Sequence, residues 1–117
     1  MATSTINQGV HFGARQVVNS YPFTAPTDGL ITINSNPQTA SESYDYFSVN
    51  NDISKGCVLS NTTGRSMTGT LVVLRGDVVR NPQTLNVGSR AAVFISISGG
   101  VTNRSFIRRT FSERGCA

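Results

Sequence analysis

The chain is poor in charged side chains and in the residue types that most enzymes use. Charged residues make up 14% of its 117 residues, against about 25% in average soluble proteins. The sequence has no tryptophan, one histidine, two cysteines and six carboxylates. So few cysteine and histidine side chains cannot fill a four-ligand zinc site, and no glycine-rich phosphate-binding loop is present. These scarcities lead us to expect no enzyme, no bound metal and no cofactor.

The histidine and the carboxylates also lie where structural roles are the simpler interpretation. His11 is in a terminal segment, whereas a Ser–His–Asp triad holds its histidine between two partners in a shaped pocket. Paired carboxylates can hydrolyse glycosides, but Asp28 and Asp77 lie at glycine turns, and Asp45 and Asp52 flank one strand candidate. We expect turn-forming aspartates and no catalytic residue, and a small hydrolase is the third-ranked hypothesis.

The sequence also lacks a long hydrophobic run. No stretch has the roughly 20 apolar residues of a membrane-spanning helix. Residues 1–10 have neither the basic start nor the apolar stretch of a secretion signal. We therefore expect a protein made in the cytoplasm, without membrane insertion. In that reducing compartment Cys57 and Cys116 would be free thiols.

What the chain has instead is a large share of uncharged polar residues and many short β-type runs. Serine, threonine, asparagine and glutamine number 14, 13, 10 and 4, and such side chains favour turns and strand faces over helix interiors. No window has the 3.6-residue apolar period of a helix. The expected strands are residues 15–20, 30–34, 44–49, 57–60, 68–74, 78–79, 84–87, 91–97 and 104–111. Short strands at this spacing predict an all-β fold, a jelly-roll-like antiparallel β-sandwich.

Turn-forming residues separate these runs. Pro26-Thr27-Asp28-Gly29 is a β-turn pattern in which Gly29 would take a positive φ. Arg75-Gly76-Asp77 is the tripeptide that integrins recognise, but it lies inside an apolar segment, so we interpret it as a tight turn with an Arg–Asp surface pair. Pro26, Gly29, Gly76 and Asp77 are thus the expected structural turn residues. Further turn signals are Asn36-Pro37, Asn50-Asn51-Asp52, Lys55-Gly56, Thr63-Gly64, Asn81-Pro82 and Val87-Gly88.

Composition and charge divide the chain into three parts. Residues 1–20 predict an extended anchoring arm, residues 21–99 a β-sandwich head, and residues 100–117 a basic tail or a final strand. Four arginines and one glutamate give the tail a charge of +3, out of +4 for the chain. The tail is either a solvated basic end or a docking segment for an acidic partner or nucleic acid, and we expect no specific nucleic-acid recognition. The candidate assembly contacts are Arg104, Arg108, Arg109 and Arg114.

Three tyrosines provide the one candidate for small-ligand binding. Tyr21, Tyr44 and Tyr46 lie near asparagine, glutamine and serine residues. Aromatic rings stack on sugar rings and amides bond to hydroxyls, so these residues could form a glycan-binding face. The alternative is that they are aromatics that pack within the strands.

Two short motifs carry a family resemblance. Residues 22–33, PFTAPTDGLITI, contain an F-x-A-P-x-x-G turn that leads into an aliphatic strand, and residues 69–79, GTLVVLRGDVV, contain two apolar strands around a Gly-Asp turn. With the strand Phe94–Ile97, they resemble the globular heads of complement-type and tumour-necrosis-factor-like proteins across residues 21–98. The matching positions are Phe23, Ala25, Pro26, Gly29, Leu71, Leu74, Gly76, Asp77 and Val79.

The chain departs from that family in ways that point to a viral variant. The head is short, it lacks the aromatic-rich middle, and an arm replaces the collagen-like stalk. In this form it is similar to small bacteriophage fibre, head-fibre and capsid decoration proteins. The resemblance implies a homotrimer with apolar strand faces buried on the threefold axis, no enzymatic activity and no transferable ligand residues.

These observations give two expectations about function. The first is a non-enzymatic structural protein of a bacteriophage virion, made in the host cytoplasm and decorating the capsid or tail. Its partners would be copies of itself and capsid or tail proteins. The alternative is a glycan-binding adhesin or receptor-binding module whose partner is a host surface glycan.

Overall fold

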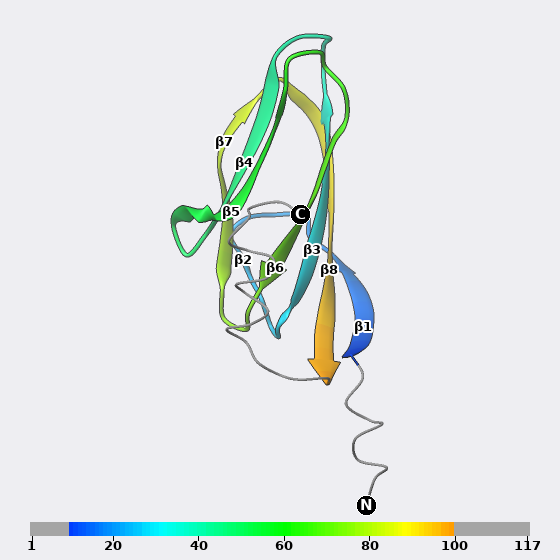
Figure 1. Ribbon diagram of the computed structural model, residues 1–117, viewed down its shortest axis with the longest axis vertical. Coiled ribbons are helices and arrows are strands. Elements are labelled where there is room, and N and C mark those ends of the chain that lie inside the picture. Colours follow the sequence, from blue (N-terminus) through cyan, green and yellow to red (C-terminus); the bar gives the residue numbers. More distant parts are fainter. Residues whose placement is uncertain (1–9, 100–117) are drawn as a thin grey trace, which may run out of the picture.

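The computed structural model describes residues 10–99, which form eight β-strands (Figure 1). The strands are β1 Val10–Val17, β2 Phe23–Thr24, β3 Gly29–Pro37, β4 Ser43–Val49, β5 Asp52–Asn61, β6 Met67–Val73, β7 Val78–Leu85 and β8 Val87–Gly99. All strand pairings are antiparallel. No helix in this described part of the chain is long and apolar enough to cross a membrane.

The strands form two four-stranded sheets with the strand order of a jelly roll. One sheet has the order β1-β8-β3-β6 and the other β2-β7-β4-β5. The chain passes from one sheet to the other at every connection except the β4–β5 hairpin. Eight antiparallel strands divided in this way between two packed sheets make a jelly roll. The predicted fold class, an all-β, jelly-roll-like antiparallel sandwich, is therefore confirmed.

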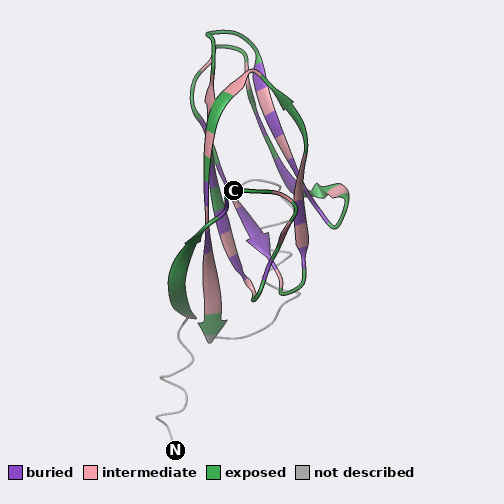
Figure 2. Cartoon of the chain, turned by 180° about the vertical axis from the view of Figure 1, so that it is seen from behind, coloured by how far each residue is buried: buried purple, intermediate pink, exposed green. Residues whose placement is uncertain are grey.

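The core lies between the two sheets and is built from alternate residues of the strands. Ile31 and Ile33 of β3 point into it, while Thr32 between them is exposed. The largest contributors are Phe47 of β4 and Phe94 of β8, one from each sheet. Figure 2 shows the alternation of buried and exposed positions along the strands. Full burial of such side chains stabilises the fold by roughly 1.5–3 kcal/mol each, and this accounts for the period-2 pattern of the sequence.

The strands are longer than the sequence predicted, because several turn-forming pairs lie inside them. β7 runs through Asn81-Pro82 without a break, and the register between β4 and β7 shifts there. β3 continues to Pro37, where its register with β8 also shifts. Such bulges accommodate a residue that has no N–H to donate to the ladder. The short strand β2 was not predicted.

The hairpin between β4 and β5 has the geometry that its sequence predicts. Asn50 and Asn51 both have positive φ angles, 54° and 65°. Two consecutive residues with positive φ form the type I′ turn that matches the twist of the flanking strands, and asparagine tolerates this region. The turn signal at Asn50-Asn51-Asp52 is therefore confirmed.

The positive φ predicted for Gly29 is wrong, and close packing explains the glycine at this position instead. Among the described residues, the glycines with positive φ are Gly64 and Gly76, and Gly29 is the first residue of β3. A Cβ atom at Gly29 would collide with the ring of Phe94 and the carbonyl oxygen of Ile95 on β8. Gly29 is required because β8 approaches its backbone closely, and not because of its backbone conformation.

The Arg75-Gly76-Asp77 tripeptide forms the tight turn between β6 and β7. The Asp77 N–H donates to the Leu74 carbonyl at 2.9 Å, and Gly76 has a φ of 87°. Positive φ at the third position of a turn is the mark of type II geometry. The Asp77 side chain is buried, at 7% exposure, so a surface Arg–Asp pair, as we expected here, does not describe this residue.

Part of the predicted arm belongs to the sandwich. Val10–Val17 form β1, which pairs along β8 at the edge of its sheet. Residues 11–17 are all exposed, so main-chain hydrogen bonds hold β1 in place more than side-chain packing does. Residues 1–9, the predicted strand 104–111 and the four tail arginines lie outside the described residues.

The expectation of free cysteines is wrong for Cys57. This residue is buried on β5 and is disulfide-bonded. Cys116, the other cysteine in the sequence, lies outside the described residues. The expectation rested on an inferred reducing compartment, in which disulfides are rare.

Candidate functional site

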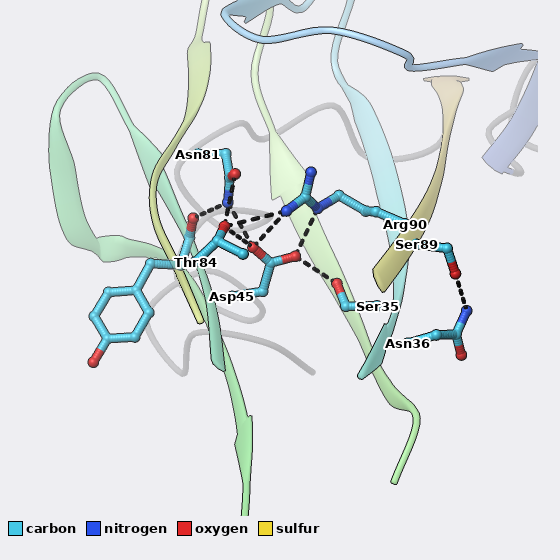
Figure 3. Close-up of polar contacts among 8 residues, drawn as sticks. Ser35, Asn36, Asp45, Asn81, Thr84, Ser89 and Arg90 are labelled. Atoms are coloured by element: carbon cyan, nitrogen blue, oxygen red, sulfur yellow. Dashed lines mark hydrogen bonds and ion pairs between the residues drawn. The ribbon is translucent and has the colours of Figure 1, made fainter. Parts of the chain in front are cut away.

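The densest group of polar side chains lies inside the sandwich (Figure 3). Asp45 on β4 is 0% exposed. Alternate residues of a strand point to opposite sides, so Asp45 points inward like Phe47, whereas Tyr44 and Tyr46 point outward. Arg90 on β8 reaches the carboxylate from the opposite sheet, with a side chain that is 25% exposed. The pair therefore links the two sheets across the interior.

Both oxygens of the Asp45 carboxylate accept hydrogen bonds. Arg90 donates from Nε to Oδ2 at 2.6 Å and from Nη2 to Oδ1 at 2.9 Å. Ser35 Oγ on β3 also donates to Oδ2, at 2.6 Å. Asn81 Nδ2 and Thr84 Oγ1 on β7 donate to Oδ1 at 2.8 Å and 2.7 Å. A carboxylate has about four lone-pair sites, so this one has no acceptor left for a substrate.

These contacts keep Asp45 ionised. Burial of Asp45 raises the pKa of its carboxyl, but hydrogen bonds from Arg90, Ser35, Thr84 and Asn81 outweigh burial and leave the pKa below its ordinary value of 3.8. The hydrogen bond to Asp45 in turn raises the pKa of Arg90, against the effect of burial. The Arg90 guanidinium also lies over the Phe47 ring, 5.6 Å from its centroid, which adds a cation–π contact. The arrangement is a structural cross-link between the sheets and lacks the features of a catalytic acid or base.

Tyr21 borders this network without joining it. Its ring packs on Phe47 at a centroid distance of 5.5 Å. The hydroxyl is buried and has no hydrogen-bond partner within residues 10–99. Burial raises the pKa of this hydroxyl, and the charges of Arg90 and Asp45 act on it in opposite directions. Tyr21 is therefore an interior residue and does not belong to a face with Tyr44 and Tyr46.

A second network closes the end of the sandwich at the β6–β7 turn. The Asp77 carboxylate accepts from the Leu74 N–H at 2.8 Å and from Asn50 Nδ2 at 3.0 Å. Asn50 Oδ1 accepts from the Val78 N–H at 2.9 Å. Asp28 Oδ1 accepts from the Arg75 N–H at 2.8 Å. Asp28 and Asp77 thus satisfy backbone donors of the turn, as expected for turn-forming aspartates.

Asn86 plays a similar part between β7 and β8. It has a φ of 56°, and its Oδ1 accepts from the Thr39 N–H and hydroxyl, both at 3.0 Å. Its Nδ2 donates to the Thr39 carbonyl and to Ser43 Oγ, again at 3.0 Å. One side chain therefore fixes the loop between β3 and β4.

Tyr44 and Tyr46 lie side by side on the outside of the β2-β7-β4-β5 sheet. Their ring centroids are 5.1 Å apart and the rings are inclined at 59°. Both are half-buried. Directly opposite them are Ser60 and Val58 on β5, and Leu85 and Gln83 on β7.

An open groove of about 430 Å³ lies beside this face, where β5 and β6 form adjacent edges of the two sheets. It is lined by Val58, Leu59, Ser60, Asn61, Arg65, Ser66, Met67 and Thr68. Asn61 is held by its own turn, since its Oδ1 accepts from the Gly64 N–H at 2.9 Å and its Nδ2 donates to the Arg65 carbonyl at 2.6 Å. Arg65 is the one charged residue of the lining, and it is exposed.

The sequence-predicted site residues are only partly brought together. Gly76, Asp77 and Asp28 meet at one turn, and Gly29 packs on β8. Arg104, Arg108, Arg109 and Arg114 lie outside the described residues. Residues 10–99 contain no group of three histidine, cysteine or acidic side chains that could hold a metal ion. Sequence reasoning missed the roles of Arg90 and Asn86, although the inward phase of Asp45 in its strand was a readable signal of a buried charge that needs a partner.

No family model matches the chain, and no curated protein or solved structure matches it.

Proposed function

We propose that this chain is a non-enzymatic structural protein of a bacteriophage virion, which self-associates as a homotrimer and decorates the capsid or tail. The jelly-roll fold and the use of its buried polar groups support the proposal. The hydrogen bonds of three polar side chains hold strands and loops in place, namely those of Asp45, Asp77 and Asn86. Buried polar groups used in this way suit a structural protein that acts through its outer surfaces.

The observation that carries the proposal is a second apolar face, on the outside of the β1-β8-β3-β6 sheet. Register places Phe12 of β1 opposite Ile97, and Val17 opposite Val93. Leu30 of β3 is opposite Ile95 of β8. Directly opposed residues point to the same side of a sheet. The inner face of this sheet carries the buried Ile31 and Phe94, so large apolar side chains lie on both sides of the sheet.

An antiparallel sheet that covers a core ordinarily turns a polar face to solvent. Here Phe12 and Val17 are each 63% exposed, and Val93, Ile95 and Ile97 are half-buried. A contiguous apolar patch of this kind marks an interaction surface. Copies of the same face packed around a threefold axis can cover it. Arg15, the single charged residue of β1, lies opposite Ile95 on this face, so its guanidinium must stay in water or find a partner in such a contact.

The tail supplies the proposed contacts with the rest of the particle. Arg104, Arg108, Arg109 and Arg114 suit fixed contacts with carboxylates of a neighbouring shell protein. Attachment through them should weaken as salt rises, since exposed charges are screened over about 8–10 Å at physiological ionic strength.

The genomic region that encodes the chain gives the direct test of the virion role. Capsid and portal genes beside it are the expected result, and antibodies against the purified chain should then label intact particles. A neighbourhood without virion genes, together with unlabelled particles, would contradict the proposal. Replacing Arg108 and Arg109 with glutamine should leave a folded protein that joins particles less well at low salt, and the difference from the native chain should shrink as salt rises.

A further inference from the structure

The outside of the other sheet carries a different surface, which we infer to be a binding site for an oligosaccharide that bears a carboxylate. It consists of the Tyr44–Tyr46 pair, the residues of β5 beside it and the groove whose lining includes Arg65. The inference stands apart from the virion role, because it depends only on the chemistry of this face.

The two tyrosines form a platform suited to sugar rings. Their rings are 5.1 Å apart and inclined, so they present an angled aromatic surface, and they are not stacked face to face on one another. Stacking on aromatic faces suits the apolar C–H side of a sugar, while the phenol groups keep a polar tip. The buried side-chain polar atom without a hydrogen-bond partner in the described part of the chain is the Tyr21 hydroxyl. The hydroxyls of Tyr44 and Tyr46 are therefore not trapped in this way and can bond to a ligand or to water.

Short polar side chains surround the platform. Gln83 lies opposite Tyr46, and Ser60 lies opposite Tyr44. Both are exposed. An amide and a hydroxyl can donate and accept together, which matches the hydroxyl groups of a sugar. The exposed Val58 and Leu85 beside them, at 43% and 39% exposure, add apolar contact area.

The platform continues into the groove through β5. Val58 and Ser60 belong both to the cross-strand neighbours of the tyrosines and to the lining of the groove. From Val58 to Asn61 the strand advances by about 10 Å, at about 3.3 Å per residue. A surface of this length accommodates several linked sugar rings better than a single one.

Charge complementarity selects an acidic sugar. The groove lining contains no carboxylate, and Arg65 is its one charge. Among the described residues the Arg65 guanidinium has no ion-pair partner. A planar guanidinium with free donors fits a carboxylate through two parallel hydrogen bonds. A uronate or sialate group at one end of the ligand therefore meets Arg65 while the other rings lie on the tyrosines.

The test is a titration of the ¹⁵N-labelled full chain with two probes, tetragalacturonate and 3′-sialyllactose, each beside its methyl ester. Binding of at least one acid, with shifts in the amide signals of Tyr46, Val58 and Arg65 and weaker binding of its ester, is the expected result. Arg65→Gln should weaken binding of the acid by about tenfold, as loss of one charge-assisted contact does. Lys55→Gln removes a positive charge of β5 that is not part of the groove lining, and it should change binding less than about twofold.

Tyr46→Ser tests the contribution of the aromatic platform to binding independently of the Arg65 charge. It should abolish binding of the acid while the remaining amide spectrum shows an unchanged fold. The inference is overturned if neither acid shifts these signals at about 5 mM, a concentration that detects even millimolar affinity. It is equally overturned if ester and acid bind alike, or if Arg65→Gln and Lys55→Gln have the same effect.

Discussion

Arg90 on β8 forms a two-pronged ion pair with Asp45 on β4, at 2.6 Å from Nε to Oδ2 and 2.9 Å from Nη2 to Oδ1, and so ties one sheet of the jelly roll to the other. The Asp45 side chain is fully buried, whereas the Arg90 side chain is 25% exposed. The pair draws Ser35, Asn81 and Thr84 into the same network. Its contribution to folding can be measured separately from the hydrophobic core.

Replacement of Arg90 with methionine should lower the free energy of unfolding by about 3 kcal/mol, because it leaves a buried carboxylate without its counter-charge. We expect the lower end of the range for buried pairs, since Arg90 is partly exposed. Urea unfolding followed by circular dichroism gives the value. Arg80→Met is the matched control: Arg80 donates an exposed hydrogen bond to Asn51, and its loss should cost less than about 0.5 kcal/mol. Equal effects of the two changes would mean that the network is not a cross-link.

The same network predicts how stability responds to acid. The pKa of Asp45 is lower in the folded chain than its ordinary value of 3.8, so its contribution is complete above that value. It is lost as the pH falls through the lower, folded-state pKa. Melting temperatures measured from pH 7 down to pH 2 should fall more steeply for the native chain than for Asp45→Asn, which begins lower and cannot titrate. Parallel curves for the two proteins would contradict this assignment.

Tyr21→Phe should leave the melting temperature unchanged or raise it. The hydroxyl is buried and has no partner among the described residues, and removing an unsatisfied buried polar group relieves a desolvation penalty of about 1–3 kcal/mol. The ring contact with Phe47 is retained. Tyr46→Phe, on the outside of the sheet, serves as a control and should have no effect on stability. A loss of more than about 1 kcal/mol at Tyr21 would show that the hydroxyl is hydrogen-bonded after all.

Gly29 and Gly76, which lie in the two motifs of the family resemblance, should respond differently to substitution. Gly29→Ala forces a Cβ atom into the Phe94 ring and the Ile95 carbonyl, and should destabilise the fold by about 1–3 kcal/mol. At Gly76 a Cβ atom meets nothing within 4 Å, and the obstacle is only its φ of 87°. Asparagine tolerates positive φ, so Gly76→Asn should cost less than about 1 kcal/mol. Thermal unfolding of both variants decides this, and the reverse order would refute the packing explanation for Gly29.

Much of the fold could be predicted from local patterns. The runs at residues 30–34, 44–49 and 91–97 lie within β3, β4 and β8, because alternation records which face of a strand is buried. The Asn50-Asn51 hairpin was equally readable, since its turn chemistry is local. The break predicted at Asn81-Pro82 was wrong because a register shift with β4 absorbs the proline inside β7. The break predicted at Asn36-Pro37 lies at the end of β3.

The polar networks could not be predicted, because their members are distant in sequence. Asp45 and Arg90 are 45 residues apart, and only the strand order brings β4 and β8 face to face. The phase of Asp45, shared with Phe47, showed that a charge is buried, but not which arginine pairs with it. The disulfide of Cys57 was missed for a different reason, because we expected a reducing compartment. The three tyrosines looked equivalent in sequence, and the fold places Tyr21 inside and the other two outside.

The most direct test of the proposed self-association is the mass of the purified chain in solution, measured by light scattering on a sizing column. The proposal predicts three times the chain mass of 12.5 kDa. Replacing Phe12 and Val17 with serine should shift the protein to single chains without unfolding it, because both side chains are 63% exposed. Ile53→Ser, which removes an exposed apolar residue on β5, should leave the oligomer intact. A native chain that stays at 12.5 kDa at micromolar concentration, or an oligomer that survives the Phe12 and Val17 changes, would contradict the account.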